Sequence, residues 1–412
     1  MFLNCCKDRK NFCIFGIIFN DMKRLVTGLI CLCFFVLSNA QDRIAIQHGP
    51  YIQNLKDSEV TIVWIVNKPA IGWVELAPDD NTNFYYQERP KYFNVTNGVK
   101  NTSLLHTVKL TGLTPGTRYR YRIFSQEVLE HQSWEIVYGR VASTSVYGTR
   151  PLSFKTNDRN KPEASFIMVN DIHGRAEDIP VLLKVAGLND ADMVIFNGDM
   201  LSQLKDEAGL FSGFMDASID LFAKEIPMYY ARGNHETRGP FATLFQHYFS
   251  PKEPNLYYLL RRGPVCFIFL DTGEDKPDSD IEYSGITDYD FYRTEQAKWL
   301  AEVVKSKEYT EAMFRVIIAH IPPVPGTSIW HGQKEVLEKF VPILNEARVD
   351  VMLCAHLHRY IHVKPDAAVK FPVVINAHQT VVKGVAKDNR LGLIVKDLEG
   401  KVIDRIILDT KY

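Results

Sequence analysis

The stretch SFIMVNDIHG, residues 165–174, decides the fold class of this chain. Its first half, Ser165 to Val169, is an apolar run with the length of a strand that is buried on both faces. Asp171 and His173 follow two positions apart, so an extended chain can point both side chains the same way. Residues of this kind at the end of a buried strand indicate an α/β domain whose site lies at the strand ends.

Apolar runs and amphipathic segments continue to alternate along the chain after Pro162. Helices are predicted over residues 179–186, 211–223, 294–305 and 333–347, and the tail from Val373 onward is again rich in strands. This alternation predicts an α/β domain over residues 161–412. The strand candidates before the tail are Ser165 to Val169, Met193 to Phe196, Met228 to Ala231, Val265 to Leu270, Arg315 to Ala319 and Val351 to Ala355.

The preceding part of the chain has a different texture, with short β-branched or alternating runs between turn residues. Strands are predicted over residues 60–66, 72–76 and 106–110. The string LTPGTRYRYRI, residues 113–123, then places a Pro-Gly turn before another strand, with Tyr119 positioned to bond its hydroxyl across the corner of a β-sandwich. This string and the Trp64 strand resemble a fibronectin type III domain. The resemblance predicts an all-β sandwich over residues 41–160.

Four more clusters of potential metal ligands follow predicted strands, as Asp171 and His173 do. Taken singly, each is more often a turn or a helix cap than a metal site. Five such clusters in order would crowd carboxylates and imidazoles at one sheet edge, which is costly without a cation. The four clusters are Asn197-Gly198-Asp199, Arg232-Gly233-Asn234-His235-Glu236, His320-Ile321-Pro322-Pro323 and His356-Leu357-His358.

This ordered set resembles the calcineurin-like metallophosphoesterase superfamily, whose pattern is Asp-x-His, Gly-Asp, Gly-Asn-His-Asp/Glu, His and Gly-His-x-His. The resemblance extends from Ala164 to the C-terminus and implies a β-sandwich flanked by helices. With the all-β domain in front, the chain is similar to the purple acid phosphatase branch, which also has an N-terminal fibronectin-like domain.

The resemblance implies two metal ions that share Asp199. Iron, zinc and manganese all suit oxygen and imidazole ligands. His235 would donate a proton to the leaving oxygen or stabilise the transition state, although a packing role for it remains open, and Glu236 would orient a ligand. The first metal would be held by Asp171, His173, Asp199 and His358, and the second by Asp199, Asn234, His320 and His356.

Three positions depart from the family pattern. His173 stands where purple acid phosphatases have glycine, and Ser202 stands where they have a metal-binding tyrosine, so we expect no charge-transfer colour and no requirement for Fe(III). Ala355 replaces the glycine of the last motif, which predicts either an unstrained turn or a shifted site. Arg175 and Arg238 could bind phosphate or be ordinary surface charges. His378 ends a late strand and could contact the metal ligands without binding the metal itself.

The N-terminus predicts a secretory signal. Lys23 and Arg24 precede an apolar stretch from Leu25 to Leu37, and the small residues up to Ala40 predict cleavage there. Translation could begin at Met22, and an uncleaved anchor is the alternative. Five of the seven cysteines precede residue 41, which leaves Cys266 and Cys354 as predicted buried free thiols, with a disulfide between them as the alternative.

Composition and charge narrow the class of partner. The 412 residues carry 48 Lys and Arg against 49 Asp and Glu, so general attraction to a nucleic-acid polymer or an acidic membrane is absent. We expect a small phosphoester as the substrate and no stable transmembrane anchor, and the oligomeric state is left open.

The combined prediction is an exported phosphoesterase that hydrolyses phosphomonoesters by attack of metal-bound hydroxide. One alternative is a phosphodiesterase that acts on nucleotides or phospholipid head groups. Another is an extracellular binding or adhesion protein with structural metals, although such a site has no need of a proton donor.

Overall fold

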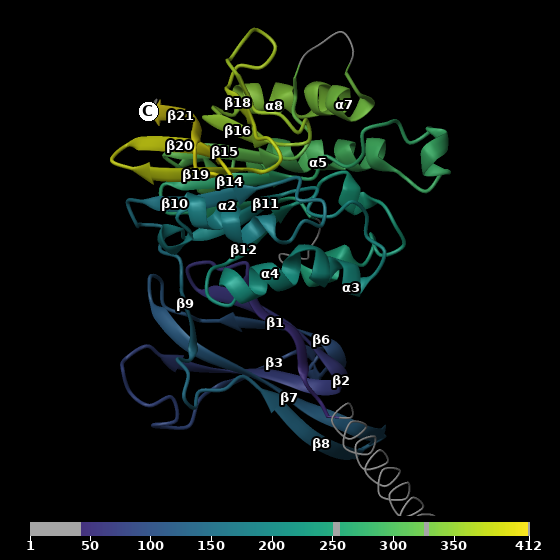
Figure 1. Ribbon diagram of the computed structural model, residues 1–412, viewed down its shortest axis with the longest axis vertical. Coiled ribbons are helices and arrows are strands. Elements are labelled where there is room, and N and C mark those ends of the chain that lie inside the picture. The colour runs from purple at the N-terminus through teal and green to yellow at the C-terminus, as the bar shows by residue number, and fades with distance from the viewer. Residues whose placement is uncertain (1–42, 250–255, 325–328, 411–412) are drawn as a thin grey trace, which may run out of the picture.

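The computed structural model describes residues 43–249, 256–324 and 329–410 (Figure 1). The predicted signal segment and its cleavage point lie outside these residues. Within the described ranges, no helix combines the length and the apolar character needed to cross a membrane.

An N-terminal β-sandwich is built around one long strand, β2 (Glu59–Pro78). The first half of β2 pairs with β1 and β6, and after a register shift between Ile65 and Ala70 its second half pairs with β3 and β7. The two strands predicted over residues 60–66 and 72–76 are therefore parts of one continuous strand. The other strands are β1 (Ile46–Gln53), β3 (Lys91–Phe93), β6 (Thr102–Thr111), β7 (Arg118–Gln132), β8 (Glu135–Ser143) and β9 (Leu152–Lys155), beside a hairpin of β4 (Val95–Thr96) and β5 (Val99–Lys100).

The corner interaction expected for Tyr119 is present. The Thr114 backbone N–H donates to the Tyr119 hydroxyl at 3.0 Å. Trp64 is fully buried at the centre of the sandwich core, where its indole N–H donates to the Ser125 hydroxyl at 2.8 Å. The likeness of this domain to fibronectin type III, and its boundary at residue 160, stay predictions.

The C-terminal part contains two six-stranded sheets that face each other (Figure 1). Phe166, Phe267 and Phe269 belong to the apolar core that the two sheets share. The first sheet runs in the order β12 (Met228–Ala231), β11 (Met193–Asn197), β10 (Ala164–Val169), β19 (Thr380–Lys387), β20 (Arg390–Asp397) and β21 (Val402–Asp409), and the second in the order β13 (Tyr258–Arg262), β14 (Val265–Leu270), β15 (Phe314–Ala319), β16 (Val351–Cys354), β18 (Val373–Ile375) and β17 (Ile361–Val363).

Helices cover the outer faces of both sheets (Figure 1). The first sheet is covered by α2 (Asp178–Ala186) and by α3 (Glu207–Leu210) with α4 (Asp216–Ser218), which continue into the π-helical turns Phe211–Met215 and Ile219–Ala223. The second sheet is covered by α5 (Tyr289–Val303), α6 (Lys307–Thr310), α7 (His331–Lys339) and α8 (Val341–Glu346). Single 3₁₀ turns span Leu188–Asp190, His235–Thr237, Phe245–Tyr248 and Ile281–Tyr283.

The predicted strands before the tail all form, but α5 starts earlier than predicted, and the helix predicted over residues 333–347 is two helices, α7 and α8, because Pro342 cannot continue the hydrogen bonds of α7. Helix α5 begins at Tyr289 rather than at Thr294. The Asp278 carboxylate accepts hydrogen bonds from the Tyr289 and Asp290 backbone N–H groups, both at 2.8 Å, and so satisfies the first turn from a residue outside the helix. Cys266 and Cys354 are buried free thiols in the core beneath α5, α7 and α8, which confirms their predicted state.

The sandwich and the C-terminal part pack against each other. Tyr51 and Val63 of the sandwich join the apolar cluster that lies under α2 and the π-helical turns. The Tyr51 hydroxyl donates to the Tyr248 carbonyl at 3.0 Å, and the Tyr229 hydroxyl donates to the Leu55 carbonyl at the same distance. Buried hydrogen bonds of this kind fix one domain against the other.

Candidate metal centre

The predicted metal ligands meet where the parallel strands of the two sheets end. Strands β10, β11 and β12 are parallel neighbours in one sheet, and β14, β15 and β16 are parallel neighbours in the other, so their carboxyl ends lie at one edge of each sheet. Asn197, at the end of β11, ties the two edges together because its side-chain amide donates to the Ala319 and Leu353 carbonyls, both at 3.2 Å. The loops that leave these strands carry the site.

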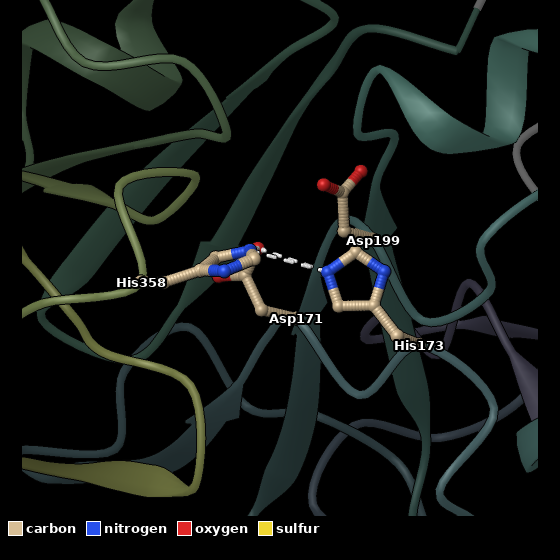
Figure 2. Close-up of side chains that lie close together, drawn as sticks. All are labelled: Asp171, His173, Asp199 and His358. Carbon is tan, nitrogen blue, oxygen red and sulfur yellow. Dashed lines mark hydrogen bonds and ion pairs between the residues drawn. The ribbon is translucent and has the colours of Figure 1, made fainter.

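At this edge, two groups of side chains are close enough to hold a metal ion, and they share Asp199. Within each group, one ligand atom from every residue lies within 4.8 Å of the others. Figure 2 shows the first group, with the imidazoles of His173 and His358 facing each other at 3.2 Å between their Nε2 atoms. The first group is Asp171, His173, Asp199 and His358, and the second is Asp199, His320 and His356.

Five of the predicted ligands occupy the left-handed backbone region, which side chains other than glycine adopt at a cost of about 1–3 kcal/mol each. Their φ angles fall between 50° and 73°. Backbone hydrogen bonds hold two of the loops in place: Asp171 N–H donates to the Gly198 carbonyl at 3.0 Å, and His173 N–H to the Asp199 carbonyl at 2.9 Å. These left-handed ligands are Asp171, His173, Asp199, His356 and His358.

Two motif glycines allow these loops to approach closely. A Cβ on Gly198 would lie 2.5 Å from the His320 Nδ1 atom, and a Cβ on Gly233 would lie 2.2 Å from an Asp199 carboxylate oxygen. Both are shorter than real contacts, so the Gly-Asp and Gly-Asn-His motifs need glycine for space.

The first group points carboxylate and imidazole atoms at one another. Asp171 is fully buried. Its Oδ2 atom accepts from the Asn170 amide at 2.7 Å and from the His356 backbone N–H at 3.2 Å. This leaves Oδ1 directed at His358, whose Nε2 is 3.2 Å away.

The second group surrounds the other side of Asp199. Its Oδ2 atom lies 3.1 Å from Nε2 of the fully buried His320. The Nδ1 atom of His320 lies 2.7 Å from the Asn197 carbonyl, which can only accept, so Nδ1 carries the hydrogen and Nε2 is free to bind a cation. Asn234 joins this group through Oδ1, which lies 3.2 Å from Nδ1 of His356.

Glu236 is buried behind the ligands and holds their backbone. Its Oε2 atom accepts from the N–H groups of Asp199 at 2.9 Å and Gly233 at 3.0 Å, and Oε1 accepts from Leu201 at 3.0 Å. One carboxylate therefore joins the loop after β11 to the loop after β12, in line with its predicted orienting role.

Charge interactions shift the pKa values of these groups in opposite directions. Burial opposes ionisation of Asp199, but His320 and His235 outweigh it and hold the pKa of this carboxyl well below its usual range. Burial also opposes the charged form of His320, yet the Asp199 carboxylate raises the pKa of this imidazole. Burial and the neighbouring Asp199 both raise the pKa of Glu236.

The donor set fits two cations. Asp171 Oδ1 and His320 Nε2 are buried without a hydrogen-bond partner, and both belong to the predicted ligand set. Orphaned buried acceptors of this kind need a cation or a proton. Carboxylate, amide and imidazole donors together suit iron, zinc or manganese.

His235 lies beside the first group, on its solvent side. Its ring packs edge to face against His173, with the centroids 4.9 Å apart, and its side chain is 27% exposed. Nδ1 lies 2.8 Å from the Ser202 carbonyl, so Nδ1 carries the hydrogen there. Nε2 is then directed toward Asp199 Oδ2 at 3.9 Å and Arg238 Nη1 at 3.4 Å.

The arginines that follow metal motifs are held by local partners. Arg175 donates to the Asp178 carboxylate at 3.0 Å and to the Asp171 carbonyl at 2.8 Å. Arg238 makes two hydrogen bonds to Glu274, at 2.6 and 2.8 Å. Both side chains therefore brace the site loops.

The sequence reasoning missed Asp275. Its Oδ1 atom lies 2.9 Å from His356 Nε2, and its Oδ2 accepts from the Asn234 amide at 3.1 Å. A signal was available, because Asp271, Glu274 and Asp275 follow the predicted strand Val265 to Leu270 as other acidic residues follow their strands.

The structure shows where the residues that depart from the family pattern lie, together with Cys354 and His378. The left-handed residues of the last motif are His356 and His358 rather than Ala355, so the turn accepts alanine there without strain. Cys354 packs in the core between the second sheet and its covering helices. The carbonyl of Ser202 contacts His235, and Nδ1 of His378 lies 3.0 Å from the His358 carbonyl.

A third group of potential ligands, Asp290, His331 and Glu335, lies at the start of α5 and α7. Two cationic side chains already neutralise it. Arg293 Nη1 is 3.2 Å from Asp290 Oδ1, and Lys339 forms a close ion pair with Glu335. We therefore assign no metal to it.

Comparison with known proteins agrees with this geometry. Residues 164–360 match the family described as calcineurin-like phosphoesterase, and residues 49–139 match the purple acid phosphatase N-terminal domain. Two relatives come from Arabidopsis thaliana. Probable purple acid phosphatase 20 is 24% identical over 372 residues, covering 81% of this chain and 78% of the relative, and purple acid phosphatase 21 is 23% identical over 279 residues, covering 64% and 54%.

A purple acid phosphatase from seeds of yellow lupin (Lupinus luteus) has the same fold, with a TM-score of 0.64 at 15% identity over 88% of this chain and 74% of the lupin chain. The paired sheets, the ligand groups at their carboxyl ends and the family matches define a phosphoesterase, which is a hydrolase. Residues 164–360 therefore form a calcineurin-like phosphoesterase domain, and residues 49–139 form a purple acid phosphatase N-terminal domain.

Proposed function

We propose that this chain is an exported enzyme that hydrolyses phosphomonoesters at a binuclear metal centre. The observation that carries the proposal is the sharing of Asp199 by two ligand groups at the ends of the parallel strands. A single metal would need only one such group. The similarity to purple acid phosphatases supports phosphomonoesters as the substrate class, and the N-terminal sequence supports export.

The proposed ligand sets follow the two groups. Asp199 would contribute to both ligand sets, and Asn234 would complete the second set through the oxygen that faces His356. Two metal ions held in this way supply an activated water as nucleophile and neutralise charge on the phosphoryl group. The first set is Asp171, His173, Asp199 and His358, and the second is Asp199, Asn234, His320 and His356.

The open side of the centre accommodates the substrate in this proposal. His358 is 48% exposed and His235 is 27% exposed, whereas Asp171 and His320 are fully buried. A phosphoester that approaches from solvent therefore meets the imidazoles of His235 and His358 first.

His235 holds the proton that the leaving oxygen needs. Its Nδ1–H is engaged by the Ser202 carbonyl, which fixes the ring and leaves Nε2 for the transferred proton. Nε2 lies 3.9 Å from the Asp199 carboxylate, so the imidazole is close to the shared ligand. A structural metal site would not need such a group, which argues against the adhesion alternative.

The test replaces the shared carboxylate. Asp199→Ala should reduce bound metal from about two ions per chain to nearly none and abolish turnover of a chromogenic phosphomonoester. Asp220→Ala is the matched control, since its carboxylate is 81% exposed and pairs only with Lys224. Full activity in Asp199→Ala would refute the proposal.

Substrate class and export need separate measurements. Monoester and diester substrates assayed side by side give the preferred class, and faster turnover of the diester would replace the monoester proposal with the phosphodiesterase alternative. Expression of the full chain in a secreting host, with N-terminal sequencing of the protein in the medium, should give a chain that begins at Gln41.

A further inference from the structure

We propose that Asp275 is a positioning residue that holds Asn234 and His356 in the orientation that binds the second metal. The inference rests on the proposed function, in which these two side chains are ligands. No predicted ligand motif contains Asp275, which lies in the loop between β14 and α5.

The two carboxylate oxygens of Asp275 each engage one of the two ligands. Oδ1 lies 2.9 Å from His356 Nε2, and Oδ2 accepts from the Asn234 side-chain amide at 3.1 Å. The remaining polar atoms of the same two side chains, Asn234 Oδ1 and His356 Nδ1, lie 3.2 Å from each other. Asp275 therefore contacts one side of the Asn234 and His356 side chains, and Asn234 Oδ1 and His356 Nδ1 face each other on the opposite side.

The chemistry of a carboxylate makes this arrangement directional. An ionised carboxylate only accepts hydrogen bonds, so it selects the amide orientation of Asn234 that turns Oδ1 away from it. It also selects the tautomer of His356 that carries hydrogen on Nε2 and leaves a lone pair on Nδ1. Two acceptor atoms that face each other at 3.2 Å repel unless a cation lies between or beside them. Asp275 thus prepares both donors for the same ion.

Asp275 is itself held firmly. Its carbonyl accepts from the Gly332 N–H at 2.6 Å, and its Oδ1 atom is buried with the His356 imidazole as its ion-pair partner. The adjacent Glu274 is fixed by its two hydrogen bonds to Arg238 and by a close contact of its carbonyl with Arg293. The carboxylate does not belong to the group formed by Asp199, His320 and His356, which favours positioning over direct ligation.

The test measures metal binding by the full chain rather than turnover. Protein stripped by a chelator is titrated with Zn²⁺ in a calorimeter, and bound zinc is counted by mass spectrometry. Asp275→Asn should leave the first binding step unchanged and weaken the second about 10–100-fold, the usual effect of losing an outer partner of a metal ligand. The control is Glu282→Gln, which neutralises a largely exposed carboxylate in the same loop.

A double-mutant cycle separates positioning from a general structural effect. If Asp275 acts through His356, Asp275→Asn should weaken the second step much less in a His356→Ala background than in the wild type. Asp275→Ser serves as a second variant if the amide disturbs folding. Equal weakening of both steps, or two steps with wild-type affinities, would overturn the inference. A wild-type chain that binds fewer than two zinc ions would instead overturn the proposed function.

Discussion

Glu236→Gln tests whether one buried carboxylate holds the ligand loops together. Glu236 is fully buried and accepts three backbone hydrogen bonds, from Asp199, Leu201 and Gly233. Glutamine has the same shape but only one acceptor atom. If its oxygen keeps the bonds to Asp199 and Gly233, its amide nitrogen faces the Leu201 N–H, so two donors oppose each other.

The magnitude follows from these three bonds. Losing one bond to a charged acceptor and leaving buried donors unpaired costs about 2–6 kcal/mol in total. Removing the charge also relieves repulsion by Asp199, which together with burial raises the pKa of Glu236. We therefore expect a loss of about 2–4 kcal/mol in the free energy of unfolding, together with weaker metal binding because both loops carry ligands.

The assay is urea denaturation of the metal-free protein. Circular dichroism monitors the unfolding, so that the transitions of the two domains can be told apart. Glu346→Gln is the control, since its side chain is 78% exposed and pairs with Lys370. A Glu236→Gln variant within about 0.5 kcal/mol of the wild type, the range of ordinary surface changes, would refute the reasoning.

Two further predictions concern histidines. His235→Ala should retain both metals and lower kcat about 10²–10⁴-fold; loss of metal in elemental analysis would make His235 a ligand instead. His106 is fully buried in the sandwich, and burial lowers its pKa from 6.5 to about 4. The unfolded chain therefore takes up a proton at a higher pH than the folded chain, so stability is lost as the pH falls from about 6.5 to about 4, by up to about 3 kcal/mol. The assay is urea denaturation at pH 7 and at pH 4.5. His106→Leu should lose less stability between these two pH values than the wild type does. An equal loss of unfolding free energy in the variant and the wild type would contradict the prediction.

The ligand positions could be predicted because their signals are local. Asp171, Asp199 and His320 each come within two residues of the end of a buried strand, and parallel strands bring their carboxyl ends to one edge. Short motifs of this kind can be identified from the sequence because the residues that form each motif are neighbours in the chain. The Tyr119 corner is a similar case, since the hydroxyl and its partner Thr114 are only five residues apart.

Features that depend on distant contacts could not be predicted in the same way. Asp288 stands at the N-cap of α5 but its side chain makes no cap hydrogen bond, and the first turn is satisfied by Asp278, which lies eleven residues before Tyr289. The sequence predicts separate strands over residues 60–66 and 72–76, yet β2 continues between them as its pairing passes from β6 to β7. Asp275 contacts His356, which is far away in the chain, and only the folded loop brings them together.

The most direct test of the account is the number of metal ions per chain and their link to turnover. Protein purified without chelator should contain about two ions per chain by mass spectrometry. Removing them should abolish hydrolysis of a phosphomonoester, and adding zinc, iron or manganese back should restore it in proportion to the second ion bound. Full turnover with one ion per chain, or with none after chelation, would contradict the binuclear centre around Asp199.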